Sequence, residues 1–189
     1  MRKSIMLIAA MCMTSVMTFA QDIIRVSTDK TDLVMKVSPK GRLYQVYLGD
    51  KFLNPADYNN LKWDVYAASD GAVCQRGHEV YATSGAEDFF EPAVAVTHAD
   101  GNMTTYLYYQ SSEQKAVKGG TETIITLKDK VYPLTVKLHY VAYAKENVIK
   151  AWSEISHKEK APITLWRYSS TMLYFKANKY FLTNYHSDW

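Results

Sequence analysis

Short stretches in which apolar and polar residues alternate recur from residue 21 onward, and no stretch sustains the period of a helix. The clearest lies in the sequence YPLTVKLHYVAYA, around residues 132–144. Successive side chains of a strand point to opposite faces, so a strand here separates an apolar set from a more polar set. The apolar set is Leu134, Val136, Leu138, Tyr140 and Ala142, and the other set is Thr135, Lys137 and His139.

Turn sequences divide the chain into further strands. The polar DKTD sequence separates predicted strands at 23–28 and 33–37, as in a meander of short antiparallel strands. An Asp-Gly pair within residues 99–102 predicts a hairpin between its flanking strands. The polar turn at 157–162 separates two long predicted strands, whereas residues 51–91 are irregular and predict long loops.

Consecutive antiparallel strands with one apolar face must bury that face against a second sheet. The pattern therefore predicts an all-β fold, a large antiparallel β-sandwich. The 15 tyrosines agree with this, because aromatic residues fit the half-buried surface of a sheet. Aromatic rings also suit sugar-binding surfaces, but core and cross-strand packing is their commoner use.

The first twenty residues predict a secretory signal peptide instead of part of the fold. Arg2 and Lys3 form a basic start, an apolar run follows, and small residues precede an expected cleavage after Ala20. The apolar run is short for a membrane span. Met11 is bulky for the position before a lipid-modified cysteine, which argues against processing at Cys12. We therefore expect a soluble periplasmic or secreted protein without a membrane partner.

Removal of residues 1–20 leaves 20 basic and 19 acidic residues, a balance of +1. No basic stripe remains that would suggest a nucleic-acid partner. The mature chain keeps one cysteine, Cys74, so an intrachain disulfide is excluded, and a free thiol is the simplest reading.

The sequence contains few motifs that are typical of metal binding, phosphate binding or nucleophilic catalysis. The histidines show no metal-binding spacing, and no glycine-rich phosphate loop or nucleophile elbow is present, so we expect neither a metal nor a cofactor. The histidines are His78, His98, His139, His157 and His186.

Three carboxylates lie close together in the sequence GAEDFFEPA, namely Glu87, Asp88 and Glu91. Glycoside hydrolysis needs two carboxyl groups that face each other across a pocket. In a strand, Glu87 and Asp88 would point to opposite faces, and the proline after Glu91 favours extended backbone. We interpret these acids as structural groups that bond backbone amides and hydroxyls where a loop becomes a strand.

The order of several segments resembles glycoside hydrolase family 36, which contains mainly α-galactosidases. The segments are LVMKVSPKGRLYQVYLGDKF, EDFFEPAVAVTHADGNMTTYLYYQS, LKDKVYPLTVKLHYVAYAKENVIKAWSEISHKEKAPITLWRYSSTML and YFLTNYHSDW. Phe90 stands where an arginine is common in the family and Ser187 where a glycine is common, and residues 54–84 match poorly. Each motif alone is weak evidence for the family. Together the motifs occur in the family's order and cover nearly all of the mature chain.

The resemblance implies that residues 21–189 form part of the family's N-terminal β-supersandwich domain. In the family this domain precedes a (β/α)₈ barrel, which carries the two catalytic aspartates of a retaining mechanism. We therefore expect the β-sandwich to be incomplete at its C-terminus, and we expect no catalytic residue in this chain. The implied substrates of the full-length enzyme are α-galactoside oligosaccharides such as the raffinose series.

In some members of the family, a loop of this domain reaches the active-site mouth of a neighbouring subunit in a homo-oligomer. By position, the resemblance implies that Asp64 and Arg76 are the substrate-binding candidates, although both could be solvated loop charges. Two other functions stay open. The chain could be a stand-alone carbohydrate-binding module, or a structural β-sandwich that mediates oligomer contacts.

Overall fold

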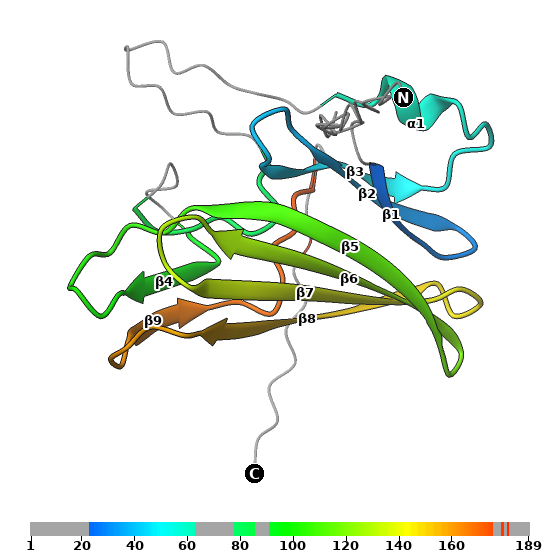
Figure 1. Ribbon diagram of the computed structural model, residues 1–189. Helices are drawn as coiled ribbons and strands as arrows, with labels where there is room; N and C mark the ends of the chain where they lie inside the picture. The colour runs from blue at the N-terminus through cyan, green and yellow to red at the C-terminus, as the bar shows by residue number, and fades with distance from the viewer. Residues whose placement is uncertain (1–22, 63–77, 86–90, 176–178, 180, 182–189) are drawn as a thin grey trace, which may run out of the picture.

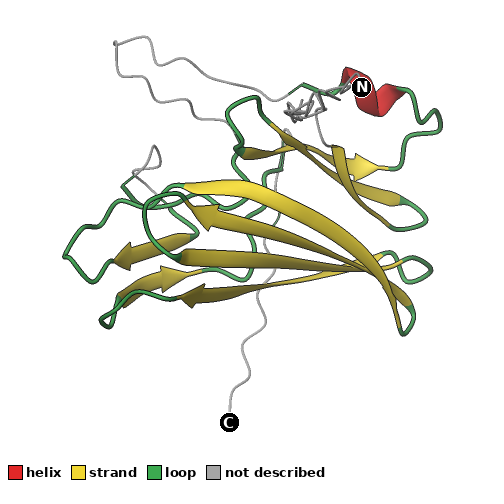
Figure 2. Ribbon diagram, in the orientation of Figure 1, coloured by secondary structure: helices red, strands yellow, loops and turns green. Residues whose placement is uncertain are grey.

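The computed structural model describes residues 23–62, 78–85, 91–175, 179 and 181, and nearly all of its regular structure is strand (Figure 2). Within these residues there are nine strands and one short helix, α1 (Asp57–Asn60). No described helix is long and apolar enough to cross a membrane. The strands are β1 (Ile23–Ser27), β2 (Thr31–Val37), β3 (Leu43–Asp50), β4 (Val94–Thr97), β5 (Leu107–Val117), β6 (Gly120–Asp129), β7 (Leu134–Tyr143), β8 (Val148–His157) and β9 (Thr164–Tyr168).

The strands form three antiparallel sheets (Figure 1). The first has the order β1-β2-β3, the second pairs β4 with β9, and the third has the order β5-β6-β7-β8. The first and third sheets are meanders in which each strand pairs with its neighbour in the chain. The all-β, antiparallel prediction is confirmed.

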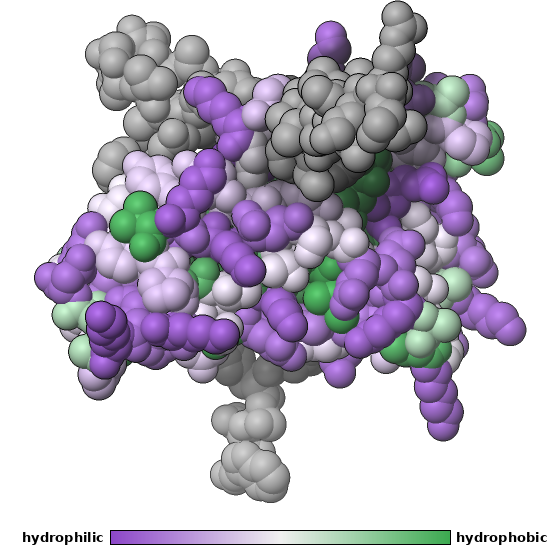
Figure 3. All heavy atoms as spheres, viewed as in Figure 1, coloured by the Kyte–Doolittle hydropathy of each residue, from purple (hydrophilic) through white to green (hydrophobic). Residues whose placement is uncertain are grey.

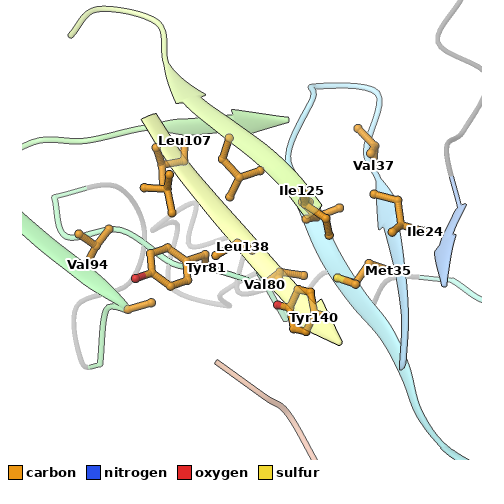
Figure 4. Packing of buried hydrophobic residues seen from close by; sticks show 14 of the residues in the cluster. Ile24, Met35, Val37, Val80, Tyr81, Val94, Leu107, Ile125, Leu138 and Tyr140 are labelled. Carbon is orange, nitrogen blue, oxygen red and sulfur yellow. The ribbon is translucent and has the colours of Figure 1, made fainter. Parts of the chain in front are cut away.

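The core lies between the first and third sheets, so the two form a sandwich. Met35 and Val37 of β2 belong to the same buried cluster as Leu138 and Tyr140 of β7 (Figure 4). The apolar face predicted for the strand at 134–143 is buried along its whole length. Because alternate residues of β2 and β7 are apolar, each sheet presents one continuous apolar face to the other.

The sequence predicted that the strands on either side of residues 99–102 pair with each other, and this pairing is wrong. The turn itself forms: Gly101 adopts a φ of 88°, and its amide donates to the His98 carbonyl at 2.9 Å. However, β4 before the turn pairs with β9, and β5 after it pairs with β6. An Asp-Gly pair favours a tight turn, but the strand that each arm joins depends on contacts far away in the sequence.

A segment without regular structure also runs through the core. Val80, Tyr81 and Ala82 are all buried, and Tyr81 is among the largest fully buried side chains of the described residues. The Tyr81 hydroxyl donates to the Ser169 carbonyl at 2.8 Å and lies 3.2 Å from the Ser153 hydroxyl. Desolvation raises the pKa of Tyr81. This segment therefore links the sandwich to the chain that follows β9.

The outer face of the third sheet differs from the polar face that alternation predicts. His139 lies on the predicted outer face of β7, but it is buried. Its Nδ1 donates to the Glu122 carboxylate at 2.8 Å. Trp152 of β8 stacks on the imidazole with ring centroids 4.7 Å apart, and Lys115 of β5 pairs with Glu122 at 3.1 Å. The hydrogen bond from His139 is the main cause that lowers the pKa of Glu122. Side chains of neighbouring strands thus bury a histidine on the outer face.

Strand β9 leaves apolar side chains in solvent, whereas its partner β4 buries Val94 and Val96. The exposed fractions of Trp166 and Tyr168 are 66% and 70%. The face of the molecule seen in Figure 3 is mostly polar, with apolar residues scattered over it. Strand β9 thus places two exposed aromatic rings close together in the chain.

Replacing Leu138 with alanine should lower the free energy of unfolding by about 2–5 kcal/mol, because the change leaves a cavity between the sheets. The matched control is Lys137→Ala on the same strand, where the side chain is exposed, and it should shift the value by no more than about 0.5 kcal/mol. Urea unfolding of both variants measures the difference. Equal losses would contradict the packing described for β7.

Candidate functional site

The two substrate-binding candidates, Asp64 and Arg76, lie outside the described residues, as does Cys74. The structure does describe the chain on both sides of them, up to Lys62 and again from His78. Buried charged side chains of β2 and of the turn after it contact these two flanks. They define the candidate site as far as the described residues reach.

The flank before the segment is held by Lys36, a buried lysine on the outer face of β2. Its ammonium donates to the backbone carbonyl of Asn59 at 3.2 Å and to that of Leu61. Carbonyls at the end of a helix lack partners within the helix, so a lysine there satisfies them. Desolvation lowers the pKa of Lys36. The lysine thereby fixes α1 and the residues after it to the first sheet.

A second polar contact fastens the same helix. The Tyr58 hydroxyl donates to the buried carboxylate of Asp32 on β2, and the Arg25 guanidinium lies 4.6 Å above the Tyr58 ring. Desolvation and the bond to Asp32 raise the pKa of Tyr58. Phe52 packs edge-on against Tyr58 with centroids 5.0 Å apart. The outer face of the first sheet is therefore covered, which explains why β2 is buried on both faces.

The flank after the segment is held by an ion pair between Arg42 and Glu79. Both guanidinium contacts to the carboxylate measure 2.8 Å, from Nε to Oε1 and from Nη2 to Oε2, and both side chains are mostly buried. This is the two-pronged geometry that makes arginine–carboxylate pairs strong. Arg42 also lies about 5.5 Å from the ring of Tyr106.

Backbone bonds complete this attachment. The Gln45 amide donates to the His78 carbonyl at 2.7 Å, and the Val80 amide donates to the Leu43 carbonyl at 3.0 Å. The His78 ring stacks on Tyr174 with centroids 4.5 Å apart. Both flanks are therefore tied to the β2–β3 hairpin, one through Lys36 and the other through the residues around Arg42.

The acidic segment is described only at its end, because Glu87 and Asp88 lie outside the described residues. Glu91 accepts a hydrogen bond from the Arg167 guanidinium of β9 at 2.6 Å. The two side chains are 76% and 45% exposed, so solvent weakens the pair and its contribution to stability is small. The contact joins the start of β4 to its partner strand. This is a side-chain partner, where the sequence suggested backbone amides and hydroxyls.

A polar cluster that the sequence analysis did not identify joins the segment between β4 and β5 to the segment between β8 and β9. His98, whose side chain is fully buried, contacts Glu159 through Nδ1 at 2.8 Å and Thr105 through Nε2 at 2.9 Å. The second oxygen of Glu159 accepts from the Ala99 amide at 2.9 Å. No spacing in the sequence links these residues, because they come from turns about sixty positions apart. Among the described residues, no group of three or more His, Cys, Asp or Glu side chains could hold a metal ion.

The chain matches the family model described as the glycosyl hydrolase family 36 N-terminal domain over residues 41–189. A comparison with curated proteins finds no match. Among solved structures, an α-galactosidase from Lactobacillus brevis is 20% identical with a TM-score of 0.66, and the match covers 81% of this chain and 24% of that one.

The α-galactosidase AgaA from Geobacillus stearothermophilus is 21% identical with a TM-score of 0.68, and the match covers 79% of this chain and 24% of that one. A structure of AgaA in complex with raffinose is 23% identical with a TM-score of 0.67 and the same coverage. The chain thus spans about a quarter of the length of these solved proteins. At such identities the likeness to them concerns the fold.

Replacing Arg42 with methionine should lower the free energy of unfolding by about 3–5 kcal/mol, because it leaves the Glu79 carboxylate buried without its main cation. The double variant Arg42→Met/Glu79→Leu should lose clearly less than the sum of the two single variants. Urea unfolding of the four proteins forms a double-mutant cycle. Strict additivity would show that the pair is not coupled and does not anchor this flank.

Proposed function

The chain belongs to the family of glycosyl hydrolase family 36 N-terminal domains, and from this premise we propose that it is the non-catalytic N-terminal domain of an exported α-galactosidase. The family match over residues 41–189 is the observation that carries this proposal. The full-length enzyme removes terminal α-galactosyl groups with retention of configuration. Export rests on residues 1–20, which lie outside the described residues.

The requirements of retaining hydrolysis indicate where the catalytic carboxylates of the enzyme would lie. One carboxylate attacks the sugar and another donates a proton, and the two lie about 5–5.5 Å apart across a pocket. In the described residues, three glutamates contact buried histidines. Glu122 and Glu154 flank His139, while Glu159 holds His98. This supports placing the chemistry in another part of the enzyme, with the sandwich supporting folding and subunit contacts.

The alternative function is a stand-alone carbohydrate-binding or structural module. The exposed aromatic side chains of β9 favour a binding or contact surface, because aromatic rings stack on sugars and are enriched at interfaces. A module of that kind would bind without hydrolysing anything, even when the full gene product is assayed. Hydrolysis by the full-length protein therefore separates the two functions.

We expect the full-length protein to release nitrophenol from a nitrophenyl α-galactoside, and the 189-residue chain alone to release none, because neither catalytic carboxylate of the family is expected within it. The assay compares both proteins with an extract of the expression host. Hydrolysis by the short chain above that background, abolished by Glu91→Gln, would place the active site in this domain. An inactive full-length protein would favour the module.

We further propose that Asp64 and Arg76 contact the sugar at the active-site rim of a neighbouring subunit in a homo-oligomer. A carboxylate accepts hydrogen bonds from sugar hydroxyls and a guanidinium donates them. The anchoring of both flanks by Lys36 and by the Arg42–Glu79 pair supports this proposal, since a segment that contacts substrate must be attached at defined points.

In the full-length enzyme, Asp64→Ala or Arg76→Ala should lower kcat/KM for raffinose by about tenfold to a hundredfold, mainly through KM. A hydrogen bond to a charged group contributes about 1.5–3 kcal/mol. The matched controls are Asp57→Ala in α1 and Lys40→Ala in the turn between β2 and β3, which remove exposed charges and should change neither constant. Unchanged KM and kcat for both rim variants would remove the proposal.

A further inference from the structure

Gln45 is a buried polar residue at a position of β3 that faces the core. It pairs with Met35 of β2, and residues paired across a sheet point to the same face. Met35 belongs to the buried apolar cluster, as does Leu43, which lies two positions before Gln45. Strand alternation therefore favours an apolar residue at position 45, yet the glutamine there is only 5% exposed. A buried amide at such a position needs hydrogen-bond partners.

The partner of the Gln45 side chain is the backbone of Tyr174, in the chain that follows β9 (Figure 1). The side-chain Nε2 donates to the Tyr174 carbonyl at 2.6 Å, and Oε1 accepts from the Tyr174 backbone N–H at 3.1 Å. One side chain thus makes the two bonds that a residue of a neighbouring strand would make with Tyr174. It thereby joins β3 to a segment without regular structure.

The same glutamine also holds the flank that follows residues 63–77. Its backbone N–H donates to the His78 carbonyl at 2.7 Å. The His78 ring stacks on the Tyr174 ring with centroids 4.5 Å apart and planes 16° from parallel. Gln45, His78 and Tyr174 therefore contact one another in a closed set, which we call the Gln45 triangle. Moving any one of its three segments breaks two of the contacts.

A β-bulge lies beside the Gln45 triangle. Strand β3 has one extra residue, Val46, between the pairs Val34–Tyr47 and Met35–Gln45. The bulge places Gln45 opposite Met35, which is the position that Val46 would take in an unbroken register with Tyr47. Bulges redirect side chains in this way and are common next to functional sites.

We propose that Gln45 is a positioning residue for the active-site rim, because it fixes the chain at His78, two residues after Arg76. The inference rests on the rim contact proposed above for Arg76, and it adds a residue that determines where this contact is made. Hydrogen bonds are directional, whereas apolar packing is not. An apolar residue at position 45 could fill the same space, but it would not align His78 with Tyr174.

The test replaces Gln45 with methionine in the full-length enzyme, which keeps the size of the side chain and removes both bonds to Tyr174. We expect KM for raffinose to rise about threefold to tenfold, as the loss of one or two hydrogen bonds allows, with kcat within about twofold. In an Arg76→Ala background, the same change should alter KM by less than about twofold, because both residues act on one contact.

A second measurement does not depend on activity. Trypsin cleaves after arginine, and local opening of a folded protein exposes such bonds. Cleavage after Arg76 should become at least about threefold faster in Gln45→Met, because the chain at His78 has lost part of its attachment. The matched control is Gln114→Met, which removes a bond of 2.9 Å from a glutamine side chain to the Arg25 carbonyl of β1. It should change KM and the cleavage rate by no more than about twofold.

Thermal unfolding checks that each variant is folded. If Gln45→Met is not folded, His78→Ala decides, because it removes the ring contact of the Gln45 triangle and should change KM and cleavage in the same direction. An unchanged KM in the folded variant, while Arg76→Ala raises KM, would overturn the inference, as would an equal rise in the Arg76→Ala background. If Arg76→Ala leaves KM unchanged, the rim proposal itself fails, and the cleavage rate then decides whether Gln45 positions this chain.

Discussion

The structure depends on one contact, the packing of the apolar face of β7 and its neighbours on β2. Leu138 and Tyr140 from one sheet belong to the same buried cluster as Met35 and Val37 from the other, and burial of such side chains is the largest favourable term in folding. Both flanks of residues 63–77 are attached to this sandwich. Tyr81 lies within the same core, so the chain that leads away from Glu79 is positioned by it.

Buried charge is the second organising feature. Lys36 and the Arg42–Glu79 pair lie on either side of the short loop between β2 and β3, and both bind chain that flanks residues 63–77. Removing these groups from water is costly, so each must be matched by carbonyls or by an opposite charge. Such contacts fix geometry more than they add stability.

The family relationship and the geometry concern different properties of the protein. A fold by itself does not identify a reaction, since function resides in particular groups placed on it. Here several described carboxylates are engaged in contacts between strands and turns, as in the pairs of Glu122 with His139 and of Glu159 with His98.

Most strand positions, the buried face of β7 and the family could be predicted from the sequence, because these follow from local alternation and from the order of motifs. Only the tertiary structure decided that β4 pairs with β9 instead of β5, since strand partners are chosen by packing between distant segments. It also decided that His139 and His98 are buried. Their surroundings, Trp152 and Glu159 among them, come from other strands and turns, and no periodicity within one segment encodes them.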